Sequence, residues 1–190
     1  MRILIIGDSQ AGNPGIAAKA ALEARGHTVV RVNHDGKGPR AYVATPALWS
    51  EYTALGRNAD AVVLLFGHND RASPRLQTAL ETLRDGVHGP VWMSGPPQYA
   101  DPVDAAEGAA LKEINRRVFG ARYIDAGPST PTSLPRDRLG WHLLRASAVP
   151  WGRAIAEAVD NRPGSSGGSP VVGILMAFGL AWTLWKAIGR

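Results

Sequence analysis

The sequence contains no cysteine, which excludes disulfide bonds and thiol chemistry and leaves the redox compartment undetermined. Clusters of Lys and Arg with interleaved aromatic residues are also absent. Of the formal net charge of +5, residues 161–190 carry +3, which leaves +2 for the rest of the chain. A domain with nearly balanced charge argues against nucleic acid as a partner.

The N-terminus lacks the pattern of a secretory signal, because its apolar run covers only residues 3–6 and leads directly into a polar turn. We therefore expect no cleaved signal peptide. The length of 190 residues has room for one domain and a tail, and a hydrophobic content of 45% suffices for a core. The sequence predicts a domain over 1–160, a Gly/Ser/Pro linker over 161–170 and an apolar helix over 171–190.

Short apolar segments alternate with helical patterns along the domain. The predicted strands are 3–6, 28–33, 61–66, 91–93 and 123–125, and the predicted helices are 14–25, 47–55, 74–84, 102–118 and 146–159. This alternation predicts the α/β class, with a parallel sheet covered by helices on both faces. We expect a doubly wound, flavodoxin-like, three-layer α/β/α fold with five strands in the order 2-1-3-4-5, followed by the C-terminal apolar helix.

Polar turns follow the first three strands, and their residues meet at one edge of such a sheet. Ser9, after the first strand, is a candidate nucleophile for acyl transfer and also offers its backbone N–H. Gly38 lets a substrate approach the main chain closely, and Asn69 offers a side-chain amide, so the three donors can form an oxyanion hole. The alternative is that the turn at Ser9 only reverses the chain and caps the next helix.

The general base must come from five histidines. His27 and His88 precede strands at the opposite edge, whereas His34 and His68 lie at the correct edge on loops that already carry the oxyanion donors. His142 ends the long loop after the fifth strand, which can carry it across three strand spacings, about 14 Å, to the nucleophile. We choose His142 as the base; the alternative is a surface histidine that caps the last helix.

Four ordered blocks of the sequence resemble those of the SGNH (GDSL-type) hydrolases over residues 2–159. The blocks are Gly7-Asp8-Ser9, Gly38, Gly67-His68-Asn69-Asp70 and a late Gly-X-His that ends at His142. The resemblance implies that Ser9 is the nucleophile and an oxyanion donor, that Gly38 and Asn69 are the other donors, and that His142 is the base. It also implies hydrolysis of an ester, often an acetyl group on carbohydrate or cell-wall glycan, or of a thioester, without a metal or organic cofactor.

Two positions depart from the family pattern. Gln10 stands where the family usually has Leu, and Leu139 stands where the last block usually has an Asp three residues before the histidine. Asp137 can substitute as the orienting acid if the loop bulges, or a backbone carbonyl can hold His142 in a Ser-His dyad. Asp8 and Asp70 are interpreted as residues that hold the turns.

Two other functions compete with an esterase. The missing acid is also compatible with a weakly active or inactive SGNH-fold domain that serves as a structural or carbohydrate-binding component of a membrane-associated or viral assembly. A flavodoxin-like nucleotide or phosphate binder would use the same edge of the sheet, but the chain lacks a Gly-X-Gly-X-X-Gly fingerprint.

The last part of the sequence predicts a membrane anchor. Residues 171–185 carry no charge, and the last part of this run contains Trp182 and Trp185. Lys186 and Arg190 follow it, an arrangement typical of a membrane interface. The alternative is a helix that docks in a groove of a partner protein or of its own oligomer. We expect the protein to be membrane-associated through residues 171–190, on a side of the membrane that the sequence leaves open.

Overall fold

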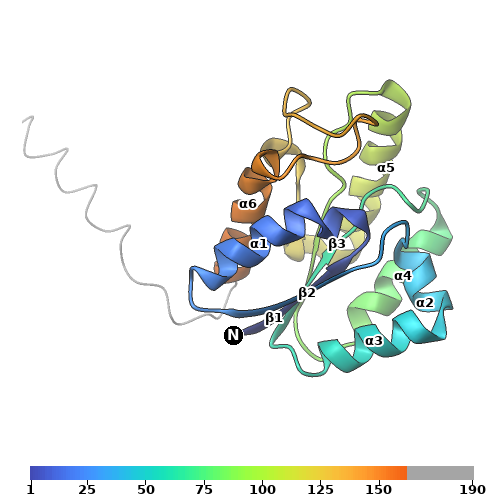
Figure 1. The fold of residues 1–190 in the computed structure, drawn as a ribbon. Helices are drawn as coiled ribbons and strands as arrows, with labels where there is room; N and C mark the ends of the chain where they lie inside the picture. Colours follow the sequence, from blue (N-terminus) through green and yellow to red (C-terminus); the bar gives the residue numbers. More distant parts are fainter. Residues whose placement is uncertain (162–190) are drawn as a thin grey trace, which may run out of the picture. The chain divides into compact units, whose positions relative to one another are not determined.

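The computed structural model describes residues 1–161. Its centre is a parallel sheet with the order β2-β1-β3-β4-β5, which confirms the predicted class and strand order (Figure 1). The strands are β1 Arg2–Gly7, β2 Thr28–Asn33, β3 Ala61–Leu65, β4 Val91–Ser94 and β5 Tyr123–Ile124. The order changes direction at β1, so the carboxyl ends of β1, β2 and β3 lie side by side.

Helices cover both faces of this sheet. They are α1 Asn13–Glu23, α2 Pro39–Ala44, α3 Pro46–Gly56, α4 Pro74–Asp85, α5 Pro102–Phe119 and α6 Val149–Asp160, with short 3₁₀ turns at η1 Ser9–Ala11, η2 Gly120–Arg122, η3 Gly127–Ser129 and η4 Ala146–Ala148. Helices α1 and α6 pack on one face, and α2 to α5 pack on the other (Figure 1). Met1–Val159 forms one compact unit.

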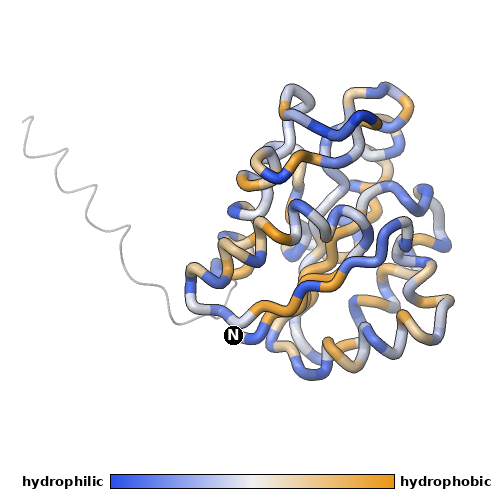
Figure 2. Tube along the Cα trace, viewed as in Figure 1, coloured by the Kyte–Doolittle hydropathy of each residue, from blue (hydrophilic) through white to orange (hydrophobic). Residues whose placement is uncertain are grey.

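The two core layers follow from the alternation of side chains along each strand. In β1, Ile3 and Ile5 point toward α1 and α6, whereas Leu4 and Ile6 point toward the helices of the other face. The strands at the centre are therefore predominantly apolar, as Figure 2 shows, because a parallel sheet buries both of its faces. This burial fixes the ends of the strands, and with them the loops that carry the polar residues.

One element differs from the prediction. Residues 39–44, which the sequence assigns to a loop, form helix α2, and the predicted helix at 47–55 is α3. A proline begins each of these helices, since a proline at the first helical position costs no hydrogen bond. The side chain of Tyr42 is fully buried and its hydroxyl donates to the carbonyl of Gly7 at 2.9 Å, so α2 is attached to the end of β1.

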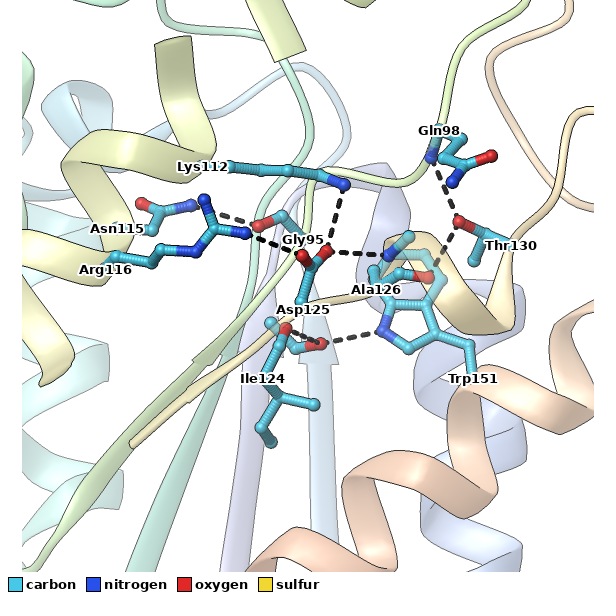
Figure 3. Close-up of polar contacts among 12 residues, drawn as sticks. Gly95, Gln98, Lys112, Asn115, Arg116, Ile124, Asp125, Ala126, Thr130 and Trp151 are labelled. Carbon is cyan, nitrogen blue, oxygen red and sulfur yellow. Dashed lines mark hydrogen bonds and ion pairs between the residues drawn. The ribbon is translucent and has the colours of Figure 1, made fainter. Parts of the chain in front are cut away.

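The long loop between β5 and α6 starts from a polar network at its base (Figure 3). Asp125 pairs with Lys112 and Arg116 of α5, both at 2.9 Å, and accepts the amide of Gly127. Thr130 donates to the carbonyl of Ala126 and accepts the amide of Gln98. The network holds residues 125–130 against α5 and the segment after β4.

Trp151 attaches α6 to the same region of the sheet. Its Nε1 donates to the Ser94 hydroxyl at 2.7 Å, and that hydroxyl donates to the carbonyl of Ile124 (Figure 3). Gly152 follows Trp151 in α6 and lies so close to the backbone of Ala17 and Ala18 that a Cβ would collide with it. Both ends of the long loop are thus fixed to the sheet and to α1.

No helix within residues 1–161 has the length and apolar character needed to cross a bilayer. The predicted anchor at 171–190 and the predicted linker from residue 162 onward lie outside the described residues.

Candidate active site

Ser9 lies directly beyond the end of β1, at the start of the 3₁₀ turn η1. The turn is tight because Gly7 lies against the carbonyl oxygen of Leu65, where a Cβ would overlap that atom. The amide of Asp8 donates to the same carbonyl at 3.2 Å, and the Asp8 carboxylate caps η1 by accepting the amide of Gln10 at 2.8 Å. The hydroxyl of Ser9 is therefore presented at the edge of the sheet from a rigid turn.

A chain of two short hydrogen bonds connects Ser9 to an acid. The Ser9 Oγ lies 2.8 Å from His142 Nε2, and His142 Nδ1 lies 2.7 Å from Asp137 Oδ2. The three side chains are partly buried, with 34% of the His142 side chain and 30% of the Asp137 side chain exposed. The structure thus brings together the predicted nucleophile, the predicted base and the substitute acid.

The position of Asp137 follows from a small antiparallel hairpin in the long loop. Arg136 pairs with Leu143 in an antiparallel bridge, and the amide of Asp137 donates to the carbonyl of His142 at 2.9 Å. Gly140 supplies the positive φ of 74° that the turn requires. Asp137 and His142 are therefore directly opposite residues, whose side chains point to the same face.

Leu139, at the position where the family pattern has its acid, lies in the turn of this hairpin and is 55% exposed. Asp137 lies five residues before His142, whereas the acid of the SGNH pattern lies three residues before the histidine. The hairpin nevertheless places the Asp137 carboxylate against the His142 ring. The hairpin turn between the two residues brings Asp137 opposite His142, so Asp137 can reach the imidazole from this position.

The Asp137 carboxylate is held in its ionised form. Partial burial raises its pKa, but hydrogen bonds from the His142 ring and from the amides of His142 and Trp141 outweigh this, so the pKa lies below its usual value. Asp137 Oδ1 accepts the amide of Trp141 at 3.1 Å and that of His142 at 3.3 Å. An ionised acceptor fixes the proton of the neutral imidazole on Nδ1 and leaves Nε2 free to accept a proton from Ser9.

Asp8 connects the turns after β1 and β3. Its carboxylate is fully buried, and Oδ2 accepts the Asn69 side-chain amide at 2.7 Å and the Gly67 amide at 2.9 Å. Burial raises the pKa of Asp8 from 3.8 to about 6, against the lowering effects of the three hydrogen bonds and of nearby His142. Asp8 therefore holds its turn, as the sequence predicts, and also orients Asn69, which the sequence does not reveal.

Gly38 and Asn69 lie on neighbouring turns. A Cβ on Gly38 would collide with the Asp70 carboxylate, so a glycine lets the turn after β2 lie close to this side chain without displacing it. Asp70 Oδ2 also accepts the amide of Arg40 at 2.8 Å. Within residues 1–161 the backbone amides of Ser9 and Gly38 donate no hydrogen bond, and the Asn69 side chain uses one of its two amide protons on Asp8.

The other histidines are not joined to Ser9. His34 pairs with Glu51 at 2.6 Å. The His68 ring makes edge contacts with Tyr99 and Trp141, at centroid distances of 4.8 and 5.1 Å, and burial is the main reason that its pKa is lowered. His88 is exposed and His27 is half-buried beside the N-terminus, as expected for the opposite edge of the sheet.

Trp141 is a contact of the site that the sequence analysis missed. Its indole Nε1 donates to Asp104 at the start of α5 at 3.0 Å, while its ring covers His68. The only indication in the sequence that Trp141 lies at the site is its position directly before His142. No group of three His, Asp or Glu side chains in the described part of the chain has the arrangement of a metal site.

No protein-family model and no curated protein matches the chain. Among solved structures, the chain is similar to LAE5, described as an alpha/beta hydrolase enzyme from the metagenome of Lake Arreo, Spain. The TM-score is 0.62 at 18% identity, over 83% of this chain and 94% of that one.

A second similar structure is the N-terminal part of BF1531 from Bacteroides fragilis, which contains a phosphatase domain complexed with Mg. Its TM-score is 0.52 at 9% identity, over 84% of this chain and 51% of that one, so the chain spans about half of its length. At these identities the likeness concerns the fold alone, which here is a three-layer α/β/α arrangement around a flavodoxin-like parallel sheet.

Proposed function

We propose that the protein is a serine ester hydrolase of the SGNH type. The observation that carries the proposal is the continuous hydrogen-bonded chain from Ser9 Oγ through His142 to Asp137, with distances of 2.8 and 2.7 Å. A nucleophile, a base and an orienting acid in this order form the arrangement that activates a serine hydroxyl. The order of the four sequence blocks supports the same family.

In the first half of the proposed reaction, Ser9 Oγ attacks the ester carbonyl carbon and transfers its proton to His142 Nε2. The carbonyl oxygen becomes an oxyanion, which the amides of Ser9 and Gly38 and the remaining proton of the Asn69 side chain stabilise. The C–O bond to the alcohol then breaks, and His142 returns its proton to the leaving oxygen. The products of this half are the free alcohol and an acyl group on Ser9.

In the second half, His142 removes a proton from water, whose oxygen attacks the acyl carbon. Collapse of the second oxyanion breaks the bond to Ser9 Oγ, which recovers the proton from His142, and the carboxylic acid leaves. Asp137 stays ionised throughout and stabilises the imidazolium that forms in both halves. The substrate class that we propose is a small acyl ester, such as an acetyl group on carbohydrate or cell-wall glycan.

The test is turnover of p-nitrophenyl acetate by the full chain. We expect Ser9→Ala to lower kcat by at least about 1,000-fold, because the nucleophile is lost while the fold is kept. Ser50→Ala, an exposed serine on α3, is the matched control and should retain wild-type turnover. A folded wild type without turnover would favour the structural or carbohydrate-binding alternative, whereas wild-type turnover in Ser9→Ala would exclude Ser9 as the nucleophile.

We also propose that residues 171–190 attach the protein to a membrane. The support is the uncharged run of fifteen residues from 171 to 185, which ends in two tryptophans and is followed by Lys186 and Arg190. A helix of the 18 residues from 171 to 188 would extend about 27 Å, which approaches the roughly 30 Å of a hydrocarbon core. The hydrolase domain would then act on substrates near a membrane surface.

A further inference from the structure

Two amide side chains that follow the nucleophile contact the backbone on both sides of His142. Gln10 Nε2 donates to the carbonyl of Trp141 at 3.3 Å, and Asn13 Nδ2 donates to the carbonyl of Leu143 at 2.9 Å. The Ser9–His142 hydrogen bond lies between these two contacts. We propose that Gln10 and Asn13 form an amide clamp that positions His142 for proton transfer with Ser9.

The segment from which the two clamp side chains project is rigid. Gln10 belongs to η1, whose backbone is capped by the buried Asp8 carboxylate, and its side chain is only 2% exposed. Arg31 of β2 donates to the carbonyl of Ala11 at 2.9 Å, which fixes the same turn from the other side. Asn13 begins α1, directly after this turn. Both amides therefore start from the segment that also fixes the position of Ser9 Oγ.

The hairpin that carries His142 is held by several contacts outside itself, of which those from Gln10 and Asn13 come from the segment directly after Ser9. Its strands are only a few residues long, and a two-stranded hairpin of this kind is at best marginally stable in isolation. The Asp137 contacts fix the ring of His142 within the hairpin, but they do not fix the hairpin relative to Ser9. Gln10 and Asn13 do so directly, since they join the turn of the nucleophile to residues 141 and 143.

The clamp explains the departure at position 10, where the SGNH pattern usually has Leu. A leucine has no donor for the Trp141 carbonyl, whereas the Gln10 amide reaches it. The orienting acid of this chain is also unusual, because it lies five residues before His142 within a hairpin. The two departures are therefore connected: a hairpin that supplies its own acid is held in place by a side chain that the common pattern lacks.

The test uses substitutions that keep the shape of each side chain and remove its donor. Gln10→Met and Asn13→Leu should each lower kcat for p-nitrophenyl acetate about threefold to tenfold, as expected for one lost hydrogen bond. The double variant should lose about 100-fold, because the imidazole is then free to move away from Ser9. KM should stay within about twofold of the wild type in all three variants, since both amides donate to the backbone of the hairpin.

Asn58→Leu is the matched control, because Asn58 donates to the carbonyl of Ala54 on an exposed helix end in the same type of bond. It should keep wild-type kcat. Hydrogen exchange supplies a readout without turnover: in the double variant, exchange should accelerate in residues 135–144 and stay unchanged in the sheet.

Wild-type kcat in Gln10→Met and Asn13→Leu, or unchanged exchange in residues 135–144 of the double variant, would overturn the clamp. The clamp depends on the proposed esterase function for its kinetic effect. Failure of that function would look different, as a wild-type chain without turnover, and hydrogen exchange alone would then decide whether Gln10 and Asn13 fix the hairpin.

Discussion

Asp8 shows how one buried carboxylate can organise two turns that are distant in the sequence. It accepts hydrogen bonds from Gln10, Gly67 and Asn69, and burial raises its pKa to about 6. Because the folded-state pKa exceeds the unfolded value, the folded protein binds the Asp8 proton more tightly than the unfolded chain does. The stability that this proton contributes is complete below about pH 4 and is lost as the pH rises through about 6.

This linkage predicts the pH dependence of an Asp8→Asn variant, which cannot titrate at this position. Between pH 7.5 and pH 4.5 the wild type should gain about 2 kcal/mol in its free energy of unfolding relative to the variant. Urea unfolding at the two pH values measures the difference. Asp35→Asn, at an exposed carboxylate, should follow the wild type. A difference between wild type and Asp8→Asn that does not change with pH would contradict the buried, raised-pKa state of Asp8.

At the scale of elements, the hairpin of the long loop decides which acid can serve His142. Asp137 lies directly opposite His142 in the antiparallel pair, whereas Leu139 lies in the exposed turn. Asp137→Asn should therefore lower kcat by about 1,000-fold or more, because the amide no longer holds the imidazole in the correct tautomer.

Adding an acid at position 139, where the SGNH pattern has one, should not restore activity. We expect the double variant Asp137→Asn/Leu139→Asp to have the same kcat as Asp137→Asn, since a side chain in the exposed turn does not face the His142 ring. Comparison of the three enzymes with p-nitrophenyl acetate checks this. Recovery of kcat in the double variant would show that the hairpin rearranges and that its pairing does not determine the acid.

The elements also show which structural information the sequence carries. The strands and their order are predictable from the sequence. Both faces of the sheet are buried, so β1 and β3 contain continuous apolar runs that are recognisable as strands. Helix α2 was missed, since its six residues are too few to show a helical period and only two of them, Pro39 and Tyr42, are buried. Short helices of this kind are specified by tertiary packing more than by local pattern.

The site follows the same division. The edge of the sheet for Ser9, Gly38 and Asn69 could be predicted, because it depends only on strand order. Two contacts could not be predicted: the hydrogen bond from Asn69 to Asp8 and the pairing of Asp137 with His142. Each depends on how segments of loop fold against one another. The contacts of Gln10 and Asn13 are invisible in the sequence for the same reason.

At the scale of the whole molecule, the proposed anchor at 171–190 can be tested with the full chain. The double variant Leu175→Asp/Leu180→Asp should move the protein from the vesicle-bound to the unbound fraction in a flotation assay, because two buried charges oppose insertion of the segment. Ser165→Asp/Ser166→Asp adds the same charge in the predicted linker and is the matched control. Equal flotation of the two double variants would exclude anchoring by the apolar segment.

The distance in sequence between Ser9 and His142 has a consequence for when the protein can become active. The two residues are 133 positions apart, and they meet only when the sheet and the long loop have both formed. The hydroxyl of Ser9 has no imidazole beside it until the long loop has folded against the end of β1. Under the proposed function, turnover would therefore report that the sheet and the long loop have both folded, because each supplies one half of the proton-transfer pair.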